Sequence, residues 1–115
     1  MQYVLIITEA AISEAVCAEI ERQFGVRIEP LGPSLSDWND EPAKVERASS
    51  LGAHEVAAVH YRATGIARLR AALLHIASLG PCLIDDDFDL FVDGRRFAEL
   101  CEQNPDSDAW WLSTR

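Results

Sequence analysis

The chain has 115 residues, a length that fits one domain, residues 1–115, with a single hydrophobic core. Its apolar fraction of 49% and charged fraction of 25% are ordinary for a folded protein and argue against disorder. A formal charge of −9 disfavours nucleic acid and anionic membranes as partners, and no apolar stretch is long enough to span a bilayer.

The first two elements are a strand and a helix. The apolar run Tyr3–Thr8 is typical of a central strand covered on both faces, and it lacks the basic residues of an export signal. Residues 12–24 predict a helix, capped by Thr8 or Ser13 and ended by Gly25. The helix is indicated by apolar side chains that recur every four residues: Ile12, Val16, Ile20 and Phe24.

The middle of the chain predicts a strand, a loop, a short helix and another strand. Val26–Glu29 alternates apolar and charged residues as a half-buried strand does, and the proline that follows should stop it. Residues 31–40 have the composition of a loop. Asp40 then caps a helix that runs to about Leu51, and His54–Arg62 reads as a strand.

The chain then predicts a second long helix. Its apolar stripe consists of Ile66, Leu69, Leu73 and Ile76, and Gly80-Pro81 ends it. Two short apolar runs follow, Cys82–Ile84 and Leu90–Val92, which can pair as a hairpin with aspartates at its tip.

A turn at Asp93-Gly94 and a short helix around Phe97–Cys101 complete the chain. The order β-α-β-α-β-α-β-β-α predicts an α+β fold, a mainly antiparallel sheet with two long helices packed on one face. A ferredoxin-like topology or a related sandwich is the closest named arrangement. The scattered cysteines Cys17, Cys82 and Cys101 predict buried thiols in a reducing, cytoplasmic compartment.

The most distinctive feature is the acid-rich segment, residues 85–108. It holds nine carboxylates and two arginines, a balance of −7 within the chain's −9. Such a concentrated negative field attracts basic partners. Trp38 in a polar loop, and Trp110 and Trp111 directly after the acids, are side chains of the kind that anchor interfaces. The alternative for Trp110 is that it folds back over the core as a lid.

Clustered aspartates between Asp85 and Asp89 leave a metal-dependent enzyme open as an alternative. An EF-hand starting at Asp85 fails at its sixth position, Leu90, and at its twelfth, Arg96. No nucleophile elbow or phosphate loop is present, so the sequence predicts no catalytic residue, no metal ligand and no cofactor. Folding could still pair a carboxylate with one of the three histidines, His54, His60 and His75.

The C-terminal third of the chain resembles a known class. The segments that carry the resemblance are Ile84-Asp85-Asp86-Asp87-Phe88-Asp89, Asp93-Gly94-Arg95-Arg96-Phe97 and Pro105-Asp106-Ser107-Asp108-Ala109-Trp110-Trp111. In this general character the chain is similar to small acidic immunity proteins of bacterial polymorphic toxin systems, including those of contact-dependent growth inhibition.

The resemblance implies a non-enzymatic antitoxin that binds the basic active-site cleft of a cognate toxin, a nuclease, and excludes its substrate. In that role Trp111 or Trp38 is the apolar anchor. The charge is expected on seven aspartates: Asp85, Asp86, Asp87, Asp89, Asp93, Asp106 and Asp108. A third alternative is a homo-oligomeric adaptor whose exposed tryptophans mediate self-association.

Overall fold

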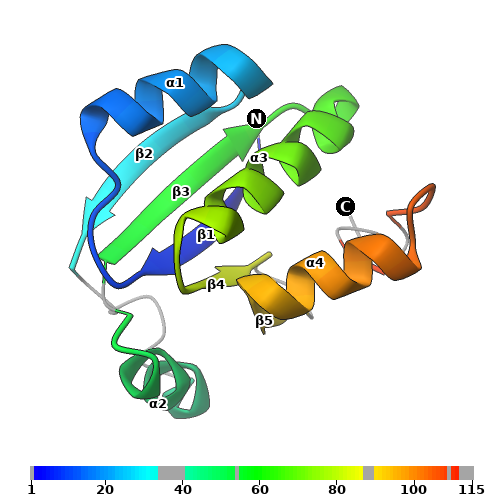
Figure 1. Cartoon of the computed structure of the whole chain (residues 1–115). Coiled ribbons are helices and arrows are strands. Elements are labelled where there is room, and N and C mark those ends of the chain that lie inside the picture. Colours follow the sequence, from blue (N-terminus) through cyan, green and yellow to red (C-terminus); the bar gives the residue numbers. More distant parts are fainter. Residues whose placement is uncertain (1, 34–40, 54, 87–89, 109, 112–115) are drawn as a thin grey trace.

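The computed structural model describes residues 2–33, 41–53, 55–86, 90–108 and 110–111. It confirms the α+β class: helices surround a five-stranded antiparallel sheet with the strand order β2-β3-β1-β4-β5 (Figure 1). The strands are β1 (Gln2–Thr8), β2 (Arg27–Gly32), β3 (Glu55–Tyr61), β4 (Cys82–Asp85) and β5 (Phe91–Asp93). The helices are α1 (Glu14–Phe24), α2 (Pro42–Ser50), α3 (Ile66–Leu79) and α4 (Gly94–Gln103), with a short 3₁₀ turn at Ala63–Gly65.

The topology is that of two interleaved β-α-β units. β1, α1 and β2 form one unit, and β3, α3 and β4 form the other. In the sheet, β3 lies between the two strands of the first unit, and β1 lies between the two strands of the second. This is the ferredoxin-like arrangement that the sequence predicts. Helix α2 is inserted between the units, and β5 and α4 are appended after them.

The helix termini follow local capping chemistry. Ser13, not Thr8, caps α1: its Oγ accepts a hydrogen bond from the Val16 N–H at 3.2 Å. Gly25 ends α1 with φ of 70°, a left-handed conformation that glycine adopts without strain. The residue before α2 is Glu41, whose side chain makes no capping bond, and the predicted cap Asp40 lies outside the described residues.

The predicted turn at Asp93-Gly94 is wrong. Asp93 is the N-cap of α4, its Oδ1 accepting from the Arg96 N–H at 2.7 Å, so the helix begins at Gly94. Gly94 allows α4 to approach α3 closely, because a Cβ there would lie 2.8 Å from Ala77 Cβ and 2.9 Å from Cys82 Sγ. The last helix is therefore longer than its apolar residues alone indicate.

Strand β2 also runs further than predicted. Instead of ending before Pro30, it continues through a bulge between Pro30 and Gly32 and pairs with β3 as far as Val56. Proline is tolerated because β2 is an edge strand, whose outward side needs no ladder hydrogen bond. On that same outward side, the Ile28 N–H donates to Glu21 Oε2 of α1 at 2.8 Å.

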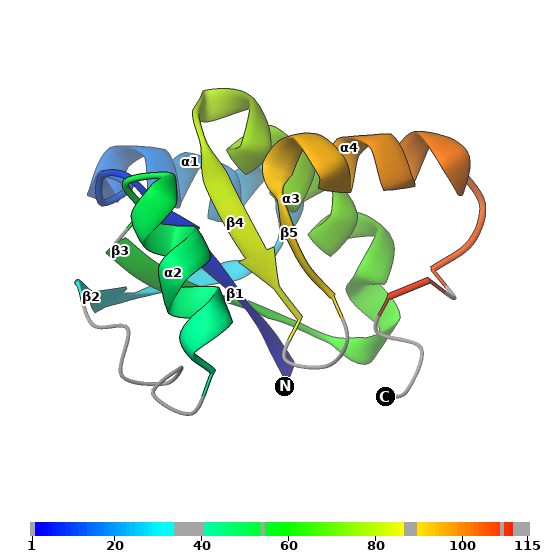
Figure 2. The ribbon, with the colours of Figure 1, turned by 90° about the horizontal axis from the view of Figure 1, so that it is seen from below.

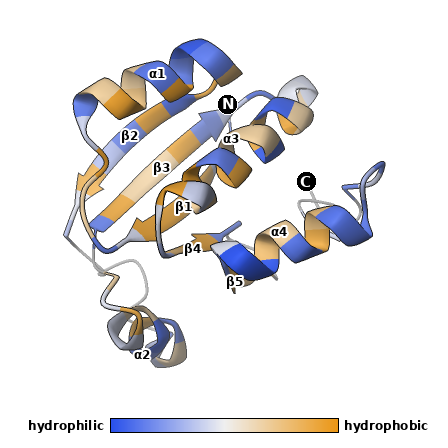
Figure 3. Ribbon diagram, viewed as in Figure 1, coloured by the Kyte–Doolittle hydropathy of each residue, from blue (hydrophilic) through white to orange (hydrophobic). Residues whose placement is uncertain are grey.

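The main core lies between the sheet and helices α1, α3 and α4. Val4 and Ile6 of β1 point into it, and the helices contribute buried residues such as Ile20, Leu73 and Phe97. Figure 3 shows the central strands coloured mainly as apolar, whereas α1 and α4 carry both kinds of residue, as amphipathic helices do. The prediction of two helices on one face is confirmed, with α4 as a third.

The opposite face of the sheet carries a smaller core under α2 (Figure 2). Because side chains alternate along a strand, Leu5 and Ile7 face this side, together with Val56 and Leu83 on the neighbouring strands. From α2 itself, only Ala48 is fully buried. Apolar packing alone therefore holds α2 weakly.

Candidate functional site

Two of the aspartates predicted to face a partner are buried. Asp85 and Asp86 are each 1% exposed, which corrects the prediction that they lie on an exposed acidic surface. The alternation of β4 turns Asp85 toward α2, where its Oδ2 lies 3.1 Å from Lys44 Nζ. Asp86 closes the β4–β5 turn, its Oδ1 accepting from the Leu90 N–H at 3.1 Å. Both carboxylates therefore stabilise the fold.

Two further aspartates have similar roles. Asp93 caps α4 and also pairs with Arg47 of α2 at 3.0 Å. Asp108 accepts a hydrogen bond from Trp111 Nε1 at 2.7 Å and lies 3.6 Å from the Arg70 guanidinium. Of the residues predicted to bind the partner, Asp106 is the only exposed one among those that the structure describes. The remaining three, Asp87, Asp89 and Trp38, lie outside the described residues.

Trp111 is 2% exposed, so the prediction that it is an exposed anchor is wrong. Its ring packs edge-on against Phe97 at 5.0 Å and stacks on Trp110 at 5.3 Å. Trp110 is half-buried and also contacts Phe97, at 5.6 Å between ring centroids. Trp110 therefore folds over the core, as the alternative for it predicted, and Trp111 beside it is buried there as well.

Arg70 of α3 fastens this C-terminal segment. Its guanidinium lies 5.7 Å from the Trp110 ring and donates to the backbone carbonyls of Cys101 at 3.2 Å and Pro105 at 3.3 Å. It also donates to the Asn104 carbonyl. A guanidinium presents five N–H donors in a planar fork, which suits several carbonyls at once. Sequence spacing gave no sign of this role, because the partners are over thirty residues away.

One histidine does meet a carboxylate. His60 of β3 lies on the face that α2 partly covers, and its Nε2 is 2.9 Å from Glu29 Oε1 on β2. The Tyr3 ring is 5.8 Å from His60. β1 separates His60 from Asp85, so the sheet does not bring this pair to the aspartates. His75 packs on Phe24 instead, at 5.6 Å, and His54 lies outside the described residues.

The described part of the chain holds no group of three histidine, cysteine or acidic side chains arranged as metal ligands. Two of its thiols, Cys17 and Cys82, are also poorly suited to nucleophilic chemistry. Burial, with the nearby Asp93 charge, raises the pKa of the Cys82 thiol to about 11, and burial raises that of Cys17. Both remain protonated near neutral pH, and a protonated thiol is a weak nucleophile.

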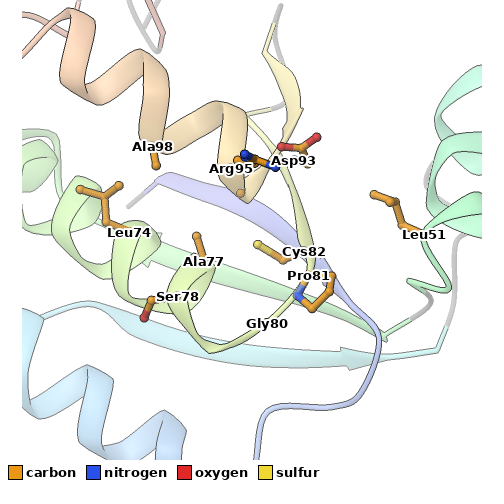
Figure 4. Close-up of a pocket in the computed structure, with 11 residues that line it drawn as sticks. Leu51, Leu74, Ala77, Ser78, Gly80, Pro81, Cys82, Asp93, Arg95 and Ala98 are labelled. Atoms are coloured by element: carbon orange, nitrogen blue, oxygen red, sulfur yellow. The ribbon is translucent and has the colours of Figure 1, made fainter.

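Hollows in the surface gather at one end of the sheet, where β1 and β2 finish and β3 and β4 begin; we call it the apolar end. The first hollow, of about 530 Å³, lies between α3, α4 and the end of α2. Figure 4 shows Ala77 and Cys82 on its inner side, Leu51 facing it from α2, and Asp93 and Arg95 near its rim.

A second hollow adjoins the first and shares Gly80 and Pro81 with it. It has a volume of about 640 Å³ and lies between the β1–α1 loop and the end of α3. A third, of about 190 Å³, shares Thr8, Ala11 and Ile12 with the second and extends beneath β2 and β3. The three therefore adjoin one another and together form a depression that is lined mainly by apolar residues.

Exposed leucines border this depression. The described residues include four large apolar side chains that are well exposed, and three of them lie at the apolar end: Leu31 at 42%, Leu51 at 38% and Leu79 at 54%. Scattered exposed leucines need no explanation, but apolar groups gathered around adjoining hollows are typical of binding surfaces. No sequence pattern marks this site, because each leucine belongs to a different element.

Comparison with protein-family models, with curated protein sequences and with solved structures finds no match for this chain. Of the helices that the structure describes, none combines the length and apolar character needed to cross a membrane.

Proposed function

We propose that this chain is a non-catalytic binding protein for a basic protein partner, acting as immunity proteins do by covering the partner's functional cleft. The observation that carries the proposal is the formal charge of −9 on 115 residues. A field of that size repels nucleic acid and draws in a protein whose cleft is basic. Such steering raises association rates, which suits an inhibitor that must stop a toxin on arrival.

The chemistry of the described side chains supports binding over catalysis. Asp85, Asp86 and Asp93 already hold the fold together, and the Cys82 thiol is protonated near neutral pH. A partner of nuclease type fits the proposal, because a cleft that grips phosphates presents the cations that carboxylates complement. The metal-dependent enzyme and the homo-oligomeric adaptor stay as alternatives.

The test is a tagged pulldown from the native cells at low and then high salt. We expect a stoichiometric basic protein that high salt releases, and that protein should lose nuclease activity when the chain is added back. Recovery of the chain alone at every ionic strength would refute the proposal. Metal bound to the chain would favour the enzyme, and a concentration-dependent mass in light scattering the adaptor.

A charge-reversal variant tests the electrostatic step. Glu99, Glu102 and Asp106 are exposed on α4 and the segment after it, and only Glu99 makes a surface ion pair, with Arg96. Changing all three to lysine alters the charge by +6, from −9 to −3. Association should slow and lose salt dependence. The matched control, E99D/E102D/D106E, conserves the charge and should associate as the original chain does.

A further inference from the structure

We infer that the partner docks on the apolar end through a basic, amphipathic segment, placing an apolar side chain in the second hollow and a lysine or arginine beside Glu9. This inference rests on the proposed function and adds the place and the manner of binding. The acid-rich segment would then contribute long-range attraction without forming the contact surface.

The second hollow has the size and lining of a built site. Its volume of about 640 Å³ falls within the roughly 300–1,000 Å³ of typical ligand sites. Ile12, Val16 and Ile76 supply apolar walls, and Leu79 stands exposed at the rim. An inserted aliphatic or aromatic side chain would therefore lose water contact on several sides, as an interface hot spot does.

The loop that forms one wall is held in place before any partner arrives. Thr8 Oγ1 donates to the Ala10 carbonyl at 2.7 Å, and Ser13 Oγ accepts from the Val16 N–H. Further along, Cys17 Sγ donates to the Ile12 carbonyl at 3.7 Å. A wall fixed by such bonds needs little ordering on association, and low ordering cost favours affinity.

Charge complementarity identifies the occupant as basic. The charged residue lining the second hollow is Glu9, and that lining the third is Glu55, so both present carboxylates. A basic side chain is thus favoured at the second and third hollows, whereas the first hollow, lined by Asp93 and Arg95, carries both signs of charge.

Two other modes of binding fit less well. A second copy of the chain would bring a charge of −9 against another −9 and place like carboxylates together. Strand addition at the β2 edge is blocked, since the outward Ile28 N–H is already bonded to Glu21 and Pro30 has no N–H to offer. Side-chain insertion at the apolar end avoids both obstacles.

The test uses a synthetic helical peptide of leucine and lysine with all its leucines on one face. Its control replaces every leucine by serine and keeps the charge. Amide chemical shifts of the ¹⁵N-labelled protein then report where each peptide binds. We expect the leucine peptide to shift the amides of residues 9–16 and 76–80, and the serine peptide to leave these amides in place.

Two variants test whether the second hollow binds the peptide. Leu79→Ser removes the exposed rim of the second hollow and should weaken binding of the leucine peptide about fivefold. Tyr3→Ser is the matched control, because Tyr3 is similarly exposed, at 41%, but lies at the start of β1, away from the apolar end. Equal binding of both peptides, shifts confined to the β4–β5 turn, or no effect of Leu79→Ser would each overturn the inference.

Failure of the inference and failure of the proposed function are distinguishable. If the pulldown yields a basic partner that the Leu79→Ser variant binds unchanged, the docking site is wrong and the function stands. If the leucine peptide binds the apolar end but no basic partner is recovered, the proposed function fails.

Discussion

Among single substitutions on α2, we expect the largest loss of folding stability at Lys44, which forms an ion pair with the buried Asp85. Lys44→Met removes the cation 3.1 Å from a carboxylate that is 1% exposed, while the methionine chain can still cover the Phe91 ring. Breaking a fully buried pair costs about 3–5 kcal/mol. The Lys44 side chain is 18% exposed and Asp85 keeps other contacts, so we expect a loss of about 2–3 kcal/mol.

Urea denaturation measures this loss, and thermal unfolding should show a melting temperature lower by about 8–12 °C. Arg47→Met is the matched control on the same helix. The Arg47 side chain is 47% exposed and that of its partner Asp93 is 36% exposed, so breaking this pair should cost about 0.5 kcal/mol. The double variant K44M/D85L should regain most of the stability, because neither charge of this pair is then left buried without its partner. Equal costs for Lys44→Met and Arg47→Met would refute the reasoning.

The same pair predicts the response to alkaline pH. Burial by itself lowers the pKa of Lys44, but hydrogen bonds and attraction from Asp85 and Glu41 outweigh it and raise the pKa above its ordinary 10.5. A raised pKa means that the pair's stabilisation is complete below about pH 10.5 and is lost as pH rises through the folded-state pKa. Lys44→Met should abolish this loss, so urea denaturation above pH 10.5 should show a smaller fall in stability for the variant than for the original chain.

Three further predictions test the packing. Gly94→Ala places a Cβ 2.9 Å from Cys82 Sγ and should cost about 1–3 kcal/mol in urea denaturation, whereas Gly65→Ala meets nothing within 4 Å and should not destabilise by overpacking. Arg70→Met should release the segment that buries Trp111, so acrylamide should quench its fluorescence more; unchanged quenching would contradict the fastening role. The Cys82 thiol, with its pKa raised to about 11 by burial, should resist labelling at pH 8 until the protein unfolds, as labelling kinetics can show.

Much of the fold could be predicted because the sequence marks it locally. The four-residue repeat of Ile12, Val16, Ile20 and Phe24 gives α1, and the apolar run Tyr3–Thr8 gives β1. The predictions that failed are those where tertiary context overrides a local signal. Pro30 ends no strand because β2 is an edge, and Asp93-Gly94 forms no turn because Asp93 caps α4.

The candidate site was less predictable, for a physical reason. Carboxylates are conspicuous in a sequence, but whether one faces water or a lysine depends on sheet register, as with Asp85 and Lys44, 41 residues apart. The apolar end is assembled from the termini of separate elements, so Leu51 and Leu79 look like ordinary helix ends in the sequence. These termini lie at one end of the sheet because its strands are antiparallel, and no local sequence pattern indicates this.

The charge and the apolar end act at different ranges, and that separates their roles. Long-range attraction depends on the summed charge of −9, so it persists even though Asp85 and Asp93 form ion pairs within the fold. Short-range contacts depend on the surface that is dehydrated on binding. Around the second hollow, this surface consists of Leu79 and its apolar neighbours. Salt should therefore change mainly the association rate of the partner, and Leu79→Ser mainly its dissociation rate. Binding kinetics measured on one partner thus test both roles independently, since a salt-dependent dissociation rate would place the carboxylates in the contact itself.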